Sequence, residues 1–275
     1  MNSNRRQFLG TAPAALAAAR VLRADPLGMP IGCQTWPVRQ DLAKDFEGTL
    51  RGRALIGYKT IEMCSPASYA DFRPLAGMTA AQMRHTIESA GLRCMSCHYN
   101  FRELKENLDE RMAFAKELGL KQMVLSTFGL PVNASLGDYK QAATDLNRVG
   151  ERTQKAGIQL GYHNHNNEFK EIDGVLIYDE LMRQFDPKLV KMQFQVAVIS
   201  LGFEAATYLK KYPGRFLSMH LADYSSSDKT AVAVGSGVVD WKKLFAAAKT
   251  SGVQNYFVEM DLREMKLSYE YLHKL

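Results

Sequence analysis

Residues 155–169 read KAGIQLGYHNHNNEF, and the start of this stretch decides the fold. Lys155-Ala156-Gly157-Ile158 has the pattern of a helix end followed by a buried strand, because glycine readily adopts the left-handed conformation that closes a helix. The predicted strand ends in a polar segment with two histidines, three asparagines and a glutamate. Polar side chains therefore cluster where this strand leaves its sheet.

The same junction occurs at four other places in the chain. In each, a helical run ends at a glycine, an apolar residue follows and a short strand begins; the glycines are Gly57, Gly91, Gly119 and Gly252. Successive junctions are roughly 30 residues or a multiple of 30 apart, which is the length of one βαβ unit.

The remaining intervals complete a set of eight predicted strands, near residues 30–36, 58–63, 93–98, 121–126, 158–163, 190–196, 215–221 and 254–259. Helical patterns lie between them, most clearly at residues 103–118, 139–156, 175–185, 205–212 and 241–250. Eight alternating units in about 250 residues match a single (β/α)8 TIM barrel. A doubly wound sheet is the alternative, but no G-x-G-x-x-G follows the first strand. We therefore expect one TIM-barrel domain over residues 25–275.

Residues 1–24 have the order of an export signal. The pair Arg5-Arg6 precedes Phe8-Leu9 and an alanine-rich segment, and no acidic residue occurs among the 24. This order resembles a twin-arginine signal and predicts export to the periplasm with removal of the segment. The apolar part is too short to span a bilayer, so no membrane attachment is expected after removal; an amphipathic surface arm is the alternative.

The charge of the remaining chain does not indicate a nucleic-acid partner. The formal charge of +6 comes from 35 basic and 29 acidic residues, but four of the arginines fall in the first 24 residues. Without them, 31 basic residues face 29 acidic ones. A chain with charges this balanced gives no argument for nucleic-acid binding from bulk charge.

The four cysteines, Cys33, Cys64, Cys94 and Cys97, are too dispersed for the disulfide framework of a small secreted domain. Cys94 and Cys97 form a C-x-x-C inside a predicted strand, where regular alternation would turn them to opposite faces. We interpret them as buried thiols, with a zinc or redox pair as the alternative.

Active sites of TIM barrels lie at the C-terminal ends of the strands, so the residues at these ends are the candidates for function. Four of the six histidines fall there: His98 after the third strand, His163 and His165 after the fifth, and His220 after the seventh. Carboxylates and an amide occupy other ends, namely Glu62, Gln195, Asp223 and Glu259. Imidazole and carboxylate groups around a barrel mouth are typical ligands of a divalent metal such as Mn, Co, Zn, Fe or Ni, and Mg is included for its carboxylate preference.

The chain also resembles a known family, the xylose-isomerase-like TIM barrels of sugar phosphate isomerases and epimerases. The resemblance begins near residue 30 and is densest from Gly157 onward, in the segments GYHNHNNEF, DPKLVKMQFQV, YLKKYPGRFLSMHLAD, GSGVVDWKKLFAAAKTSGV and YFVEMD. In that family a divalent metal is bound by a residue of the fifth strand, an Asp after the sixth, a His after the seventh and a Glu after the eighth. By position, the resemblance implies His163 or His165, Gln195, His220 and Glu259.

Two positions depart from the family pattern. Gln195 stands where relatives usually have Asp, and its neutral amide would bind a metal more weakly. Glu168, in the loop after the fifth strand, is therefore a candidate ligand or base. Ala222 stands at a position where the family usually has Lys, which argues against a phosphorylated substrate.

The resemblance implies a metal-dependent sugar isomerase or epimerase that abstracts a proton next to a carbonyl. Export favours an unphosphorylated sugar or keto-sugar as substrate, and a homo-oligomer is compatible with this. Candidate catalytic residues are Glu168, Glu259 and His98, and candidate substrate-binding residues are Trp36, Glu62, Tyr99 and Asp223. The alternatives are a lyase or hydratase of 3-keto-glycosides, which uses the same proton abstraction, a non-catalytic sugar-binding barrel, and a metal-dependent nuclease, which the balanced charge disfavours.

Overall fold

The structure, a computed structural model, describes residues 25–275. The predicted export signal at residues 1–24 lies outside the described residues. Eight parallel strands form the centre of the molecule: β1 (Gly32–Gln34), β2 (Thr60–Cys64), β3 (Arg93–Tyr99), β4 (Gln122–Leu125), β5 (Gln159–His163), β8 (Val190–Gln195), β9 (Phe216–Leu221) and β12 (Asn255–Val258).

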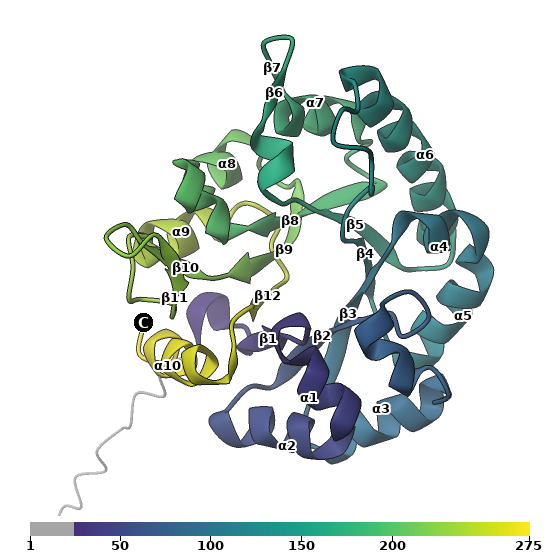
Figure 1. The fold of residues 1–275 in the computed structure, drawn as a ribbon, viewed down its shortest axis with the longest axis vertical. Coiled ribbons are helices and arrows are strands. Elements are labelled where there is room, and N and C mark those ends of the chain that lie inside the picture. Colours follow the sequence, from purple (N-terminus) through teal and green to yellow (C-terminus); the bar gives the residue numbers. More distant parts are fainter. Residues whose placement is uncertain (1–24) are drawn as a thin grey trace, which may run out of the picture.

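These strands close into a barrel in the order β1-β12-β9-β8-β5-β4-β3-β2, as the ring of arrows in Figure 1 shows. Each strand pairs with its neighbours in parallel, and β1 pairs with both β2 and β12 to complete the closure. The prediction of a single (β/α)8 barrel is confirmed.

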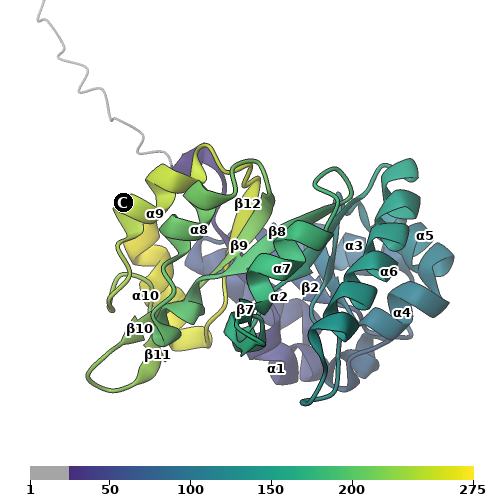
Figure 2. The same ribbon diagram turned by 90° about the horizontal axis from the view of Figure 1, so that it is seen from above.

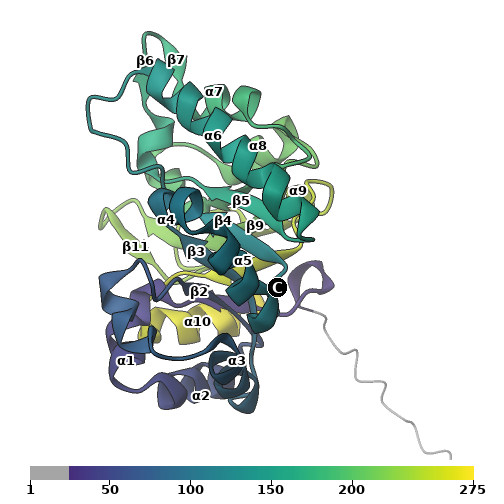
Figure 3. The same ribbon diagram turned by 90° about the vertical axis from the view of Figure 1, so that its right-hand side faces the viewer.

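Helices form the layer outside the strands, as the views in Figures 2 and 3 show from two other sides. Their bounds are α1 (Arg39–Lys44), α2 (Phe46–Ile56), α3 (Ala80–Ser89), α4 (Phe101–Glu106), α5 (Leu108–Leu118), α6 (Leu136–Lys155), α7 (Ile177–Gln184), α8 (Ala205–Lys211), α9 (Trp241–Ala248) and α10 (Leu262–Leu272). None of the helices within residues 25–275 combines the length and apolar character that a membrane span requires.

The five glycines that the sequence marks as helix ends all have positive φ angles, between 77° at Gly157 and 128° at Gly57. An L-residue rarely adopts this conformation, so glycine at these positions lets each helix stop and turn into the next strand. The repeated junction therefore has the physical cause that the sequence pattern indicates.

The loops contain shorter elements. The 3₁₀ helices are η1 (Pro26–Gly28), η2 (Trp36–Val38), η3 (Ala70–Leu75), η4 (Asn166–Phe169) and η5 (Val196–Leu201). Two hairpins, β6 (Glu171–Ile172) with β7 (Val175–Leu176) and β10 (Asp223–Ser225) with β11 (Thr230–Val232), follow β5 and β9. Both hairpins lie toward the same end of the molecule in Figure 2.

Two barrel strands each contain one extra residue. Met95 of β3 has no partner opposite the Ile61–Glu62 step of β2, and Leu217 of β9 has none opposite the Met192–Gln193 step of β8. Such a bulge shifts the alternation of side chains by one residue.

The bulge at Met95 corrects the prediction for the cysteine pair. Cys94 pairs with Ile61 and Cys97 with Met63, so both face the helix layer rather than opposite sides. Cys94 lies near Ile87 of α3 and Leu118 of α5. All four cysteines are buried and free, which agrees with their interpretation as buried thiols.

Candidate active site

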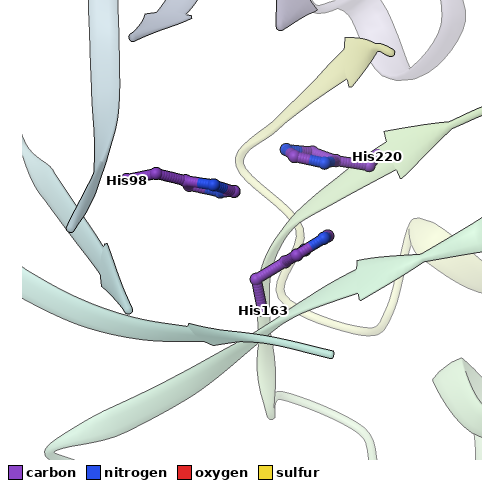
Figure 4. Close-up of side chains that lie close together, drawn as sticks. All are labelled: His98, His163 and His220. Atoms are coloured by element: carbon purple, nitrogen blue, oxygen red, sulfur yellow. The ribbon is translucent and has the colours of Figure 1, made fainter. Parts of the chain in front are cut away.

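Three imidazoles converge inside the C-terminal end of the barrel. His98 comes from β3, His163 from β5 and His220 from β9, and their side chains point toward one another in Figure 4. The ring centroids lie 5.1 Å apart for His98 and His163, 4.3 Å for His163 and His220, and 5.2 Å for His98 and His220. One nitrogen from each ring lies within 4.8 Å of the others, and all three residues are buried.

Two of these histidines belong to the same local pattern. Both β3 and β9 read Ser-x-His after their bulge, as Ser96-Cys97-His98 and Ser218-Met219-His220. Residues two apart in a strand share a face, so each serine lies on the barrel interior below its histidine. The bulges therefore set which residues of these strands enter the site.

Glu62 lies at the centre of the polar interior and has no exposed surface. Its Oε1 accepts hydrogen bonds from Ser96 Oγ and from Gln193 Nε2, the latter at 2.8 Å. Its Oε2 lies 3.1 Å from His98 Nε2 and is also hydrogen-bonded to His220 Nε2. The imidazoles and the strands enclose Glu62 in this structure, and its role in binding substrate stays a prediction.

His220 lies between two carboxylates, with Nε2 against Glu62 and Nδ1 3.2 Å from Glu259 Oε2. Burial alone would lower the pKa of His220, but Glu259 and Glu62 outweigh it and raise this pKa to about 10. Burial alone would raise the pKa of both carboxyl groups, yet the neighbouring imidazoles hold them below their ordinary values. Without a bound ion, both of these carboxyl groups and the His220 imidazole are therefore charged at neutral pH.

Gln195 contacts the carboxylate of Glu259 directly. Gln195 Nε2 donates to Glu259 Oε2 at 2.6 Å, while its Oε1 accepts from the backbone N–H of Ala197 at 3.3 Å. The Gln195 backbone N–H in turn donates to Asn164 Oδ1 at 3.2 Å. The amide that stands at the expected Asp position therefore orients Glu259 in this structure.

The two histidines of the His-x-His segment have different surroundings. His163 is buried in the cluster and its Nδ1 has no hydrogen-bond partner. Burial lowers the pKa of His163 well below its ordinary value, and the adjacent imidazoles add to this, so the ring is neutral at pH 7. His165 is exposed, and its ring meets that of His163 edge-on at 4.7 Å. The structure thus places His163 within the cluster and His165 on its solvent side.

Glu168 does not join the cluster. Its Oε1 accepts a hydrogen bond from Tyr162 OH at 2.7 Å, and its Oε2 accepts one from the His165 backbone N–H, also at 2.7 Å. Tyr162 alternates with His163 along β5 and packs against Phe185 on the helix side of the strand. Glu168 therefore holds the turn at η4 from behind β5 in this structure, and its role as base or ligand stays a prediction.

Tyr99 and Asp223 are also directed away from the cluster. Tyr99 follows His98 on β3, so its side chain faces the helices and borders a cavity of about 400 Å³ with Arg111 and Phe114 of α5. Asp223 is buried, and its carboxylate accepts hydrogen bonds from the backbone N–H groups of Tyr224, Gly235 and Val239 and from Trp241 Nε1. In this structure Tyr99 faces the helices and Asp223 binds the loop after β9, and substrate contact by either residue stays a prediction.

Trp36 begins η2 directly after β1 and keeps 37% of its surface exposed. Its ring contacts Tyr69 edge-on at 5.8 Å and lies under the Arg39 guanidinium at 4.4 Å. Among the predicted substrate-binding residues, Trp36 is the one that the structure leaves accessible at the barrel end.

Three residues of the site were not predicted to have a role: Ser96, Gln193 and Ser218. They are fully buried, and Gln193 Nε2 lies 2.8 Å from Ser218 Oγ. The repeated Ser-x-His and the Gln-x-Gln of residues 193–195 are sequence signals that could have indicated them, because period-two spacing puts both members of each pair on one face.

Comparison with known proteins identifies the family. Residues 53–270 match the family model of xylose isomerase-like TIM barrels. The chain belongs to this family. The resemblance found in the sequence is thus confirmed.

Two proteins are similar to this chain in sequence, and one further structure is similar in fold. An inosose dehydratase from Geobacillus thermodenitrificans is 26% identical over 204 residues, which cover 63% of this chain and 68% of that protein. A sugar phosphate isomerase/epimerase from Parabacteroides distasonis superposes with a TM-score of 0.75 and 26% identity, over 95% of this chain and 98% of that one. The IOLI protein with a bound zinc atom superposes with a TM-score of 0.64 over 90% of this chain and 94% of that one; at 15% identity, this likeness shows the fold alone.

Proposed function

We propose that this protein is a metal-dependent lyase that removes water from a keto-sugar or a cyclic keto-polyol. The observation that carries the proposal is the group of His98, His163, His220 and Glu259 at the C-terminal end of the barrel. The reaction begins with abstraction of the proton next to the carbonyl, and the hydroxyl group on the following carbon then leaves as water.

The residues present fit a divalent metal ion. The buried Nδ1 of His163 has no hydrogen-bond partner, and its neutral ring offers a lone pair that burial would otherwise leave unsatisfied. The three imidazoles supply nitrogen and Glu259 supplies carboxylate oxygen, a donor set suited to Zn, Mn, Fe, Co or Ni more than to Mg. A bound ion would supply Lewis-acid polarisation of the substrate carbonyl.

Glu259 is the residue best placed to handle the substrate proton. Its side chain is 19% exposed, whereas Glu62 is enclosed, so a substrate in the barrel mouth can reach Glu259. The hydrogen bond from Gln195 holds the carboxylate in place, and its lowered pKa keeps it ionised and ready to accept a proton. The carboxylic acid formed at Glu259 then returns this proton to the leaving hydroxyl group, which departs as water.

The nature of the site favours an uncharged substrate. No lysine or arginine is among the hydrogen-bond or ion-pair partners that the described residues give to His98, His163, His220, Gln195 or Glu259. Ala222, next to Asp223, provides no cation either. A phosphorylated sugar would lack a counter-ion here, whereas hydroxyl and carbonyl groups need none.

The relatives support elimination as the first choice, because the similar protein from Geobacillus thermodenitrificans is named a dehydratase of inosose, a cyclic keto-polyol. Isomerisation or epimerisation is the second candidate, supported by the name of the Parabacteroides structure. Both reactions share the abstraction of a proton next to a carbonyl, so the residues named above would serve either.

The test incubates the purified protein, loaded in turn with Mn, Co and Zn, with an inosose, a 3-keto-glycoside and a set of ketoses in D₂O. Elimination predicts loss of one water from the product mass together with an unsaturated or diketone product. Deuterium uptake with an epimer and no loss of water would favour the second candidate. Binding of far less than one equivalent of metal, together with no deuterium uptake from any compound, would contradict both candidate reactions. A sugar-binding barrel would then remain.

A further inference from the structure

Beneath the three imidazoles lies a set of four fully buried polar residues, Glu62, Ser96, Gln193 and Ser218, which we call the floor of the site. None of them can touch a substrate at the barrel mouth. They are held together by hydrogen bonds from Ser96 and Gln193 to Glu62 and from Gln193 to Ser218. A set of polar side chains buried this deeply is stable only if each donor meets an acceptor. The direction of each hydrogen bond can therefore be worked out.

The orientation of the Gln193 amide fixes the proton of His98. Gln193 Nε2 lies 2.8 Å from Glu62 Oε1, and a carboxylate can only accept, so the amide nitrogen must be on this side. Gln193 Oε1 then faces His98 Nε2 at 2.7 Å. Because an amide oxygen also only accepts, His98 Nε2 must carry a proton, and its 3.1 Å contact with Glu62 Oε2 requires the same.

Glu62 is fully occupied by donors. Ser96 and Gln193 donate to its Oε1, and His98 and His220 lie against its Oε2. These four partners match the lone-pair sites of a carboxylate, so none remains for a metal ion. The other nitrogen of His220, Nδ1, faces Glu259 at the mouth.

We propose that Glu62 and Gln193 are positioning residues that keep a proton on Nε2 of His98 and of His220, so that Nδ1 is the nitrogen that each ring gives to a metal ion or substrate. The use made of Nδ1 rests on the proposed function. The position of the proton rests on the floor alone and can be measured without metal or substrate.

The first experiment records ring ¹⁵N NMR spectra of ¹⁵N-histidine-labelled, metal-free protein. We expect His98 to show a proton-bearing Nε2 and a bare Nδ1, and we expect Gln193→Leu to abolish this preference. Gln122→Leu is the matched control, because Gln122 is a buried glutamine of the same barrel whose side chain, among the described residues, bonds to Gln254 and Asn255. A proton on Nδ1 of His98 in the wild-type protein overturns the proposal even if the Leu variant does not fold.

The second experiment uses ¹¹³Cd²⁺ as the probe metal. We expect scalar coupling from cadmium to Nδ1 of His220, and we expect Glu62→Gln to raise the cadmium dissociation constant about 10- to 100-fold without changing the number of ligands seen by X-ray absorption. Glu103→Gln, which changes a buried glutamate outside the barrel interior, is expected to leave both unchanged.

Coupling to Nε2 of His220, or loss of one oxygen ligand in Glu62→Gln, would show that Glu62 binds the metal and overturn the proposal. Failure of the wild-type protein to bind cadmium would instead contradict the proposed function, and the His98 spectrum would still decide the role of the floor.

Discussion

At the scale of single residues, the site separates two glutamates by depth. Glu62 and Glu259 contact opposite nitrogens of the same imidazole of His220, but Glu62 is enclosed while Glu259 borders the mouth. Equivalent substitutions at these two positions should therefore have different effects on proton transfer.

The substitution Glu259→Gln tests the role of this carboxylate. The amide keeps the shape but cannot accept a proton, so we expect kcat/KM to fall about 10²- to 10⁴-fold in the metal-loaded enzyme. Steady-state kinetics and deuterium uptake from solvent measure the effect. Glu270→Gln, an exposed change on α10, is the control. A variant at position 259 that retained wild-type deuterium uptake would exclude Glu259 as the base.

The substitution Gln195→Asp tests the departure from the family pattern. It replaces the donor to Glu259 by a second carboxylate, so in the absence of metal we expect a loss of about 1–3 kcal/mol in the free energy of unfolding. With metal, the added charge should raise affinity roughly tenfold or more. Urea unfolding in chelator and calorimetric titration with Zn²⁺ measure the two effects, and Gln195→Asn separates charge from length. Weaker zinc binding by the Asp variant would show that residue 195 does not approach the ion.

At the scale of elements, the loop after β9 depends on one carboxylate. Asp223 accepts four N–H groups, from Tyr224, Gly235, Val239 and Trp241, and thereby joins the β10–β11 hairpin to the start of α9. Gly237 lies so close that a Cβ there would be 2.4 Å from Asp223 Oδ1. The segment is therefore shaped around this side chain.

We expect Asp223→Asn to lower the free energy of unfolding by about 1–3 kcal/mol, because one oxygen acceptor becomes an NH₂ donor that faces N–H groups. Amide hydrogen exchange should increase in residues 223–241 and remain unchanged in β2 and β3. Asp228→Asn, at the exposed end of the same hairpin, is the control. A change in KM without loss of stability would instead indicate that Asp223 contacts substrate.

The helix ends and strands could be predicted from the sequence because each depends on neighbours in the chain. The glycine at each junction determines its own φ angle, and the apolar runs mark the barrel strands. The outward direction of Tyr99 could have been predicted in the same way, because alternation turns it outward once His98 faces inward. The direction of Glu168 could not, because it is held by Tyr162 across the turn.

The histidines and Glu259 could be predicted as candidate site residues from the sequence, because they end apolar strands. The floor was missed because its contacts join residues far apart in the sequence, such as Glu62 and Gln193. Their partnership appears only when β2 and β8 face each other across the closed barrel.

At the scale of the whole molecule, the cysteines limit stability at alkaline pH. Burial raises the pKa of the Cys33 thiol from an ordinary 9.0 to about 12, although nearby Arg53 opposes this shift. A folded-state pKa above the unfolded one contributes stability that is present below pH 9 and is lost as pH rises toward 12.

We therefore expect the free energy of unfolding to decline from pH 9 to pH 12, and to decline less steeply in Cys33→Ala. Urea unfolding at a series of pH values measures the slope. Ile31→Val, another buried change next to β1, should shift stability by the same amount at every pH because no titrating group is removed. Identical slopes for wild type and Cys33→Ala would contradict the expectation.

The extra residues Met95 and Leu217 bear on attempts to transplant this site into other barrels. Each immediately precedes a Ser-x-His segment and shifts the alternation of inward-facing side chains along its strand by one residue. Copying only the serine and histidine into a regular strand would keep their spacing. The residues that precede them in that strand would then face the wrong side of the sheet. A designer who grafts the site should therefore treat bulge and Ser-x-His as one four-residue cassette, and should insert it rather than substitute it.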